Sequence, residues 1–277
     1  ALTTPVEVAP KVQRLVAAAQ RNTHDPFIEI DWDQPILDTA FYLPPEHLPL
    51  FGTDVWKQMS EIERIEYSRH ETASLCSAGI WFENILMSMV LKHLYDLPAS
   101  DASHHYLLIE TADECRHSSM FGEFIRRAGT PAYEVDPILR LGGRYLTGIA
   151  GRAAGFIAIL AAEEILDVVN RATMKDERVH PLSRSSAKLH VVEEARHMSF
   201  ARAWIEGVWP TLNPLDRIRA SALAPAYVKG IVDALVNPAV YQELGIKDGS
   251  RIARHNPHHR AQVKEGLGRL VSLLEAV

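Results

Sequence analysis

The feature that most constrains the fold of this chain is a repeat that places ionisable residues at matching positions 80 residues apart. Residues 77–90, SAGIWFENILMSMV, align with residues 157–170, IAILAAEEILDVVN, so that the first glutamate of each segment coincides. At the same offset, DECRHSS (113–119) falls on EEARHMS (193–199), and in each half the Glu-x-x-His motif follows the first glutamate by 31 residues. Helix amphipathicity does not require equal spacings, so the repeat indicates two related pairs of helices.

The spacing within each pair brings the repeated glutamates to one level of a bundle. Glu83 lies 14 residues before the break at Leu97, and Glu114 lies 13 residues after Asp101. At about 1.5 Å per residue both are about 20 Å from the turn, so they meet in an antiparallel hairpin. Within each motif, Glu and His at i and i+3 project from one helix face. One Glu from each of two helices and Glu-x-x-His from each of two others form the dinuclear site of ferritin-like proteins, so we predict an all-α fold with a ferritin-like four-helix bundle core.

Start and stop signals support this helical interpretation. SEIE is a capping box, with Ser60 at the N-cap and Glu63 three residues later, and a proline-free stretch follows as far as Leu97. No alternating strand pattern of useful length occurs. The expected helices cover roughly residues 11–20, 60–97, 100–128, 143–175, 183–208, 214–236 and 259–275.

We expect a single domain over residues 1–277. Residues 1–55 are rich in proline and predict an arm that wraps over the core, with one short helix. Residues 56–208 form the expected four-helix metal-binding core, and residues 209–277 add C-terminal helices.

The charges of the repeated glutamates indicate which cofactor the core would hold. Four carboxylates inside an apolar bundle are very costly unless they are compensated, and two divalent ions would neutralise them. Carboxylate and imidazole ligands suit two iron ions, or manganese, whereas a structural zinc site would favour cysteine. The two cysteines, Cys76 and Cys115, suggest neither a disulfide framework nor a thiolate site.

One position breaks the repeat. Glu110 of the first half aligns with His190 of the second, which lies one helical turn before Glu194 and therefore faces the same way. We predict that His190 is a further ligand and that Glu110 is a supporting or structural residue, because a fifth ligand carboxylate would spoil charge neutrality. The predicted metal ligands are Glu83, Glu114, His117, Glu163, His190, Glu194 and His197.

The acid that precedes each ligand glutamate of the two motifs is a candidate support. A metal-bound histidine generally donates its other ring N–H to a carboxylate. We therefore predict that Asp113 holds His197 and that Glu193 holds His117, crosswise between the two halves. The arginine within each motif could pair with these acids or lie on the surface.

Composition excludes several classes of protein. The net charge of −6 argues against a dedicated nucleic-acid binder. The longest apolar run, residues 155–162, is too short to span a bilayer, and the first residues lack the pattern of a signal peptide. We expect a cytoplasmic protein that binds neither nucleic acid nor membranes.

The predicted ligand set resembles that of the p-aminobenzoate N-oxygenase family, the non-haem di-iron enzymes of aureothin and chloramphenicol biosynthesis. The additional histidine, His190, separates that family from ferritins, bacterial multicomponent monooxygenases and the ribonucleotide reductase small subunit. The arm segment FYLPPEHLPLFGTDVWKQMS also looks like the entry segment of that family. The resemblance implies a ferritin-like bundle, a homodimer, and oxidation of an arylamine by O₂ to the hydroxylamine and then the nitro compound. Turnover would need an external reductant or an electron-transfer protein.

Two alternatives stay open at the level of the sequence. The same ligands could serve a C–H hydroxylase or another oxidase with a non-amine substrate, since the surrounding pocket sets the chemistry. Ferritin-like iron storage or ferroxidase activity is an alternative of another class. The length of the chain, its proline-rich arm and its histidine-rich site count against storage.

Overall fold

The long helices predicted from the sequence begin at residues that cap them. The computed structural model describes residues 3–149 and 151–277, which are helical apart from connecting segments and one isolated bridge. Helix α4 (Glu61–Asp96) starts with the predicted capping box, in which Ser60 accepts from the Glu63 N–H and Glu63 accepts from the Ser60 N–H. Helix α5 (Ala102–Ala128) starts at Asp101, whose side chain caps it, and ends at Gly129 with a φ of 67°.

The third predicted helix is divided, which corrects the expected span of 143–175. Helix α6 (Pro137–Ile149) is separate from helix α7 (Gly151–Thr173). Gly151 has a φ of 72°, in the left-handed region that interrupts a right-handed helix and that glycine adopts without steric cost. The fourth predicted helix is α8 (Pro181–Val208), which begins with a proline in its first turn.

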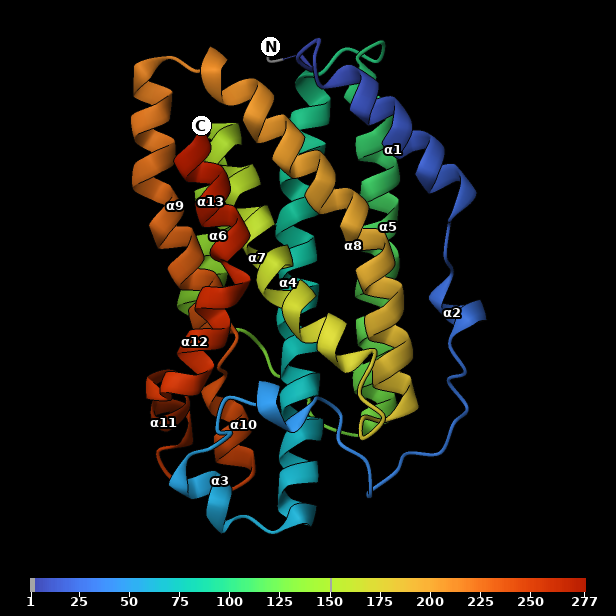
Figure 1. Cartoon of the computed structure of the whole chain (residues 1–277), viewed down its shortest axis with the longest axis vertical. Coiled ribbons are helices and arrows are strands. Elements are labelled where there is room, and N and C mark those ends of the chain that lie inside the picture. Colours follow the sequence, from blue (N-terminus) through green and yellow to red (C-terminus); the bar gives the residue numbers. More distant parts are fainter. Residues whose placement is uncertain (1–2, 150) are drawn as a thin grey trace.

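Helices α4, α5, α7 and α8 form the core bundle (Figure 1). The most extensive packing is between α4 and α5 and between α7 and α8, the two pairs that the repeat predicts. Helix α1 (Ala9–Arg21), in the N-terminal segment, packs on α5 and α8. Helix α6 packs on α4 and α7, and α9 (Pro214–Ala234) packs along α7.

The segments outside the core contain more helix than the sequence predicts. The 237–256 region, expected to be a loop, holds α10 (Pro238–Glu243) and α11 (Gly249–His255), and the predicted helix at 259–275 is divided into α12 (Pro257–Gly266) and α13 (Gly268–Ala276). Asn237 and Asn256, each followed by a proline, cap α10 and α12. The remaining short elements are α2 (Pro26–Glu29), η1 (Pro45–His47), α3 (Asp54–Gln58) and η2 (Trp209–Thr211).

Helix α4 is the one described helix whose length and composition would allow it to cross a membrane. Core helices of soluble bundles meet the same criteria, and 44% of its apolar stretch is buried inside the protein.

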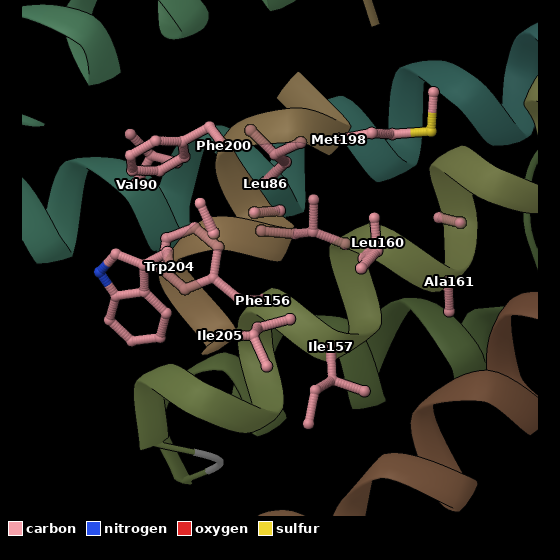
Figure 2. Close-up of a cluster of buried hydrophobic side chains, with 14 of the residues drawn as sticks. Leu86, Val90, Phe156, Ile157, Leu160, Ala161, Met198, Phe200, Trp204 and Ile205 are labelled. Atoms are coloured by element: carbon pink, nitrogen blue, oxygen red, sulfur yellow. The ribbon is translucent and has the colours of Figure 1, made fainter. Parts of the chain in front are cut away.

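A large apolar cluster joins the four core helices, and Figure 2 shows the part of it on α4, α7 and α8. Leu86 and Val90 come from α4, Phe156 and Leu160 from α7, and the α8 side includes Trp204. The Trp204 ring lies 4.2 Å from that of Phe156, between ring centroids. The cluster fixes the relative positions of these helices directly beside the repeated Glu and His residues.

Replacing Trp204 with alanine should destabilise the fold by about 3–5 kcal/mol, because the side chain is buried and its removal leaves a cavity. Urea denaturation followed by circular dichroism measures the loss. Tyr95→Ala is the control, since Tyr95 is 92% exposed and should change stability by no more than about 0.5 kcal/mol. Equal effects of the two substitutions would contradict this description of the core.

Candidate metal centre

The structure brings the seven predicted ligands together in the middle of the bundle. Each is almost completely buried, although carboxylates and imidazoles are rarely buried without partners. Glu83 comes from α4, Glu114 and His117 from α5, Glu163 from α7, and His190, Glu194 and His197 from α8.

The two Glu-x-x-His motifs face each other across the bundle. His117 Nδ1 lies 2.8 Å from Glu114 Oε2 and 3.1 Å from Glu194 Oε1. His197 Nδ1 lies 3.1 Å from Glu194 and 2.9 Å from Glu114 Oε1. The Nδ1 atoms of both histidines therefore point toward the carboxylates at the centre.

His190 approaches the same centre through its other ring nitrogen. Its Nε2 lies 3.9 Å from Glu83 Oε1 and 3.9 Å from Glu194 Oε1. Burial lowers the pKa of His190 to about 4, so the ring is neutral at pH 7. A neutral imidazole whose Nε2 faces two carboxylates has the form that a metal ion requires.

The candidate ligand atoms fall into overlapping groups. Within each group, one oxygen or nitrogen atom from every residue lies within 4.8 Å of those from the others. The groups are Glu83, His117 and His190; Glu114, His117 and Glu194; Glu163, His190 and Glu194; and Glu110, Glu114 and His197. The overlap is the arrangement expected where carboxylates bridge two neighbouring ions.

The electrostatics of the cluster favour the binding of cations. Burial, together with the carboxylates of Glu114 and Glu194, raises the pKa of Glu83 well above its usual value. The pKa of Glu163 is raised by the same causes. Glu83 Oε2, Glu163 Oε2 and His190 Nε2 are buried and have no hydrogen-bond partner within the described part of the chain. Carboxylate and imidazole atoms left in this state fit two divalent ions, which would supply both the charge and the missing partners.

Behind the two motif histidines lies a layer of acids and arginines. His117 Nε2 donates to Glu193 Oε2 over 2.9 Å, and His197 Nε2 donates to Asp113 Oδ2 over 3.1 Å. These are the crosswise partners that the sequence predicts. A carboxylate behind a histidine fixes its orientation and its tautomer.

The motif arginines complete this layer. Arg116 forms an ion pair with Asp113, and Arg196 Nη2 lies 3.2 Å from Asp113 Oδ2 and 3.5 Å from Glu193 Oε1. Of the two possibilities left open by the sequence, the structure shows pairing. The supporting acids are therefore charge-compensated from outside, which keeps their charge from adding to that of the central carboxylates.

Glu110 lies closer to the centre than a purely structural residue would. It is buried beside Glu114 and His197. Burial raises the pKa of Glu110 to about 8, so its carboxyl group holds a proton at pH 7. The neutral form resolves the charge conflict that a fifth carboxylate would otherwise create.

The neighbouring glutamates Glu163 and Glu164 have different partners. Glu163 faces the cluster, whereas Glu164 forms an ion pair with Arg202. The repeat offset selected Glu163, and the pairing of Glu164 accounts for the second buried carboxylate.

Asn170 is a site residue that the sequence analysis missed. It lies on α7 two helical turns after Glu163, and its Nδ2 is 3.1 Å from His190 Nδ1. If His190 Nε2 keeps its lone pair for a metal ion, Nδ1 carries the proton and donates to the amide oxygen of Asn170, which a rotation of the amide brings into place. The signal in the sequence that could have indicated this role is the position of Asn170 on the same helix face as Glu163.

An apolar cavity of 290 Å³ adjoins the cluster at Glu163. Its walls come from α4, α6, α7 and α9, so it lies between the core and the two helices packed against it. The cavity gives a small molecule a water-poor position next to the candidate metal centre.

The fold and this cluster define a class: an all-α bundle protein whose four long helices carry buried glutamates and histidines that could hold metal ions. A family model described as p-aminobenzoate N-oxygenase AurF matches residues 7–277. The chain belongs to this family, as the ligand pattern predicts, and membership supports an oxygenase of the di-iron type.

Similar proteins occur in mycobacteria. An uncharacterised protein of Mycobacterium bovis and another of Mycobacterium tuberculosis are each 29% identical to this chain over 235 residues. Each match covers 82% of this chain and 69% of the relative.

Replacing Asn170 with leucine should weaken metal binding about 10-fold or more, because His190 loses the group that orients its ring. Anaerobic titration of the metal-free protein with Fe(II), followed by calorimetry, measures the affinity. Asn84→Leu is the matched control, since Asn84 is exposed on α4 and bonds the Ile80 carbonyl. Unchanged Fe(II) affinity in Asn170→Leu would rule out this role.

Proposed function

We propose that the protein is a di-iron oxygenase that uses O₂ to oxidise the nitrogen of an amine, most suitably an arylamine, to the hydroxylamine and nitro level. The observation that carries this proposal is the seven-residue cluster with its third histidine, in a family of N-oxygenases and beside an apolar cavity.

The seven residues would hold two iron ions, and His190 would give one of them a second imidazole. When bound, the iron pair supplies the redox chemistry that reduces O₂ and oxidises the substrate. Manganese is the other metal that suits these ligands.

The protein contributes positioning and the exclusion of water. Asp113 and Glu193 orient the two motif histidines through their Nε2 atoms. Glu110, whose pKa is raised to about 8 by burial, lies beside Glu114 and His197. The apolar walls keep the substrate away from bulk water and leave the edge of the cavity at Glu163 as its approach to the cluster.

The proposal includes two partners. Oxygenase turnover at a metal pair consumes electrons, so an external reductant or an electron-transfer protein must supply them. We also propose that the protein is cytoplasmic and forms a homodimer. Light scattering coupled to size-exclusion chromatography would test the dimer, which should have a mass near twice the 31.0 kDa of the chain.

Iron analysis tests the metal centre directly. Anaerobic reconstitution with Fe(II) should give two iron ions per chain, and His190→Ala should retain about one, because one site loses its second imidazole. His105→Ala, which removes an exposed histidine, should keep both. One zinc ion per chain, or two tightly held ions in His190→Ala, would overturn the assignment.

Product analysis tests the reaction. The Fe(II)-loaded protein, given O₂, a reductant and an arylamine, should form the hydroxylamine and then the nitro compound, identified by mass spectrometry with ¹⁸O₂ label in the product. Glu163→Gln should lower the yield at least 10-fold, because it removes a ligand charge. Hydroxylation of ring or alkyl carbon with no N-oxidation would replace this proposal with a C–H oxygenase.

A further inference from the structure

The cavity beside Glu163 has an unusual polarity for a site next to a charged cluster. Its described lining contains three side chains with nitrogen or oxygen atoms, namely the carboxylate of Glu163, the hydroxyl of Tyr227 and the indole N–H of Trp81. No lysine, arginine or histidine lines it among the described residues. Glu163 Oε2 is buried and without a hydrogen-bond partner there.

The shape of the lining suits a ring. Trp81 and Phe82 from α4 and Tyr227 from α9 supply aromatic walls, while Ala158 and Ala162 from α7 leave room along the floor. Aromatic side chains pack favourably against an aromatic ligand through offset or edge contacts. The volume of 290 Å³ is sufficient for a small substituted ring and too small for a large polycyclic molecule.

Charge restricts the ligand further. A carboxylate in this cavity would lie near Glu163 with no cation from the described lining to compensate it, and an unpaired buried charge is costly. An alkylamine carries a positive charge at pH 7 and would lose its hydration in the same apolar walls. An arylamine is neutral at this pH and does not incur that cost.

Two arginines line a different cavity. Arg140 and Arg144 line a separate, more open cavity of 450 Å³, together with Asn84 and Ser88. Arg140 is paired with Glu134. Trp81, Ile85 and Gly143 line both cavities. Arginine side chains therefore line the outer cavity, and none is among the described residues that line the cavity beside Glu163.

We propose that the substrate is an uncharged arylamine whose ring substituents are apolar or neutral, and that an arylamine bearing a carboxylate is excluded from the inner cavity. This inference rests on the proposed N-oxygenase function and specifies its substrate class. The selectivity comes from the walls of α4, α6, α7 and α9.

Two matched ligand pairs test the proposal by binding alone. Calorimetry on the anaerobic Fe(II)-loaded protein at pH 7.5 compares methyl 4-aminobenzoate with 4-aminobenzoate, and 4-methylaniline with its isomer benzylamine. The neutral member of each pair should bind at least 10-fold more tightly. Tighter or equal binding of 4-aminobenzoate or of benzylamine would overturn the proposal, as would failure of both neutral ligands to bind.

A pair of variants tests whether the ligand binds in the cavity beside Glu163. Ala226→Phe adds a ring to an α9 residue that lines the cavity, and Ala222→Phe adds the same ring one turn earlier, at an exposed residue that lines neither cavity. Ala226→Phe should weaken methyl 4-aminobenzoate binding at least 10-fold, with Ala222→Phe unchanged. Equal affinities in the two variants would contradict the assigned location.

Binding and turnover separate this inference from the proposed function. Selective binding of the neutral arylamines without any N-oxidised product would leave the cavity assignment intact and refute the N-oxygenase proposal. N-oxidation of 4-aminobenzoate at a rate equal to that of its methyl ester would support the function and overturn the substrate class.

Discussion

The burial of four glutamates at one level of the bundle is the constraint on which the rest of the structure depends. Burial and the neighbouring carboxylates raise the pKa of Glu83 and of Glu163. The pKa values of Glu114 and Glu194 are shifted the other way, below the usual value. Although burial would raise the pKa of Glu194, His197 and His117 keep it well below its usual range. Such a cluster is stable only if the charges that enter the bundle are balanced, and two divalent ions would provide that balance.

The acids and arginines behind the motif histidines are also balanced in charge. Asp113 and Glu193 stand behind the motif histidines, and Arg116 and Arg196 compensate them from the outer side. Charge alternates from the centre outward, from carboxylate to imidazole to carboxylate to guanidinium. The arginines orient the acids, and the acids orient the histidines. A rigid geometry therefore results from residues that are individually unfavourable in a core.

The sequence was sufficient to predict the parts of the structure that repeat. The equal spacing of Glu83 and Glu163 from their Glu-x-x-His motifs gave the pairing of α4 with α5 and of α7 with α8, because helical rise converts equal spacing into equal height. The break at Gly151 was missed because no proline or polar loop marks it in the sequence. Asn170 was missed because its role depends on a contact with another helix, and the cavity was missed because α6 and α9 have no counterpart in the repeat.

The left-handed Gly151 has a consequence for how the cavity wall can change independently of the cluster. It separates α6 from α7, so a helix that lines the cavity is not a rigid continuation of one that carries Glu163. Helices α6 and α9 contribute much of the cavity wall, yet none of the seven clustered residues lies on them. Helices α4 and α7 carry clustered residues and also line the cavity, whereas α6 and α9 line the cavity alone. Substitutions in α6 and α9 can therefore change the cavity wall without replacing any of the seven clustered residues.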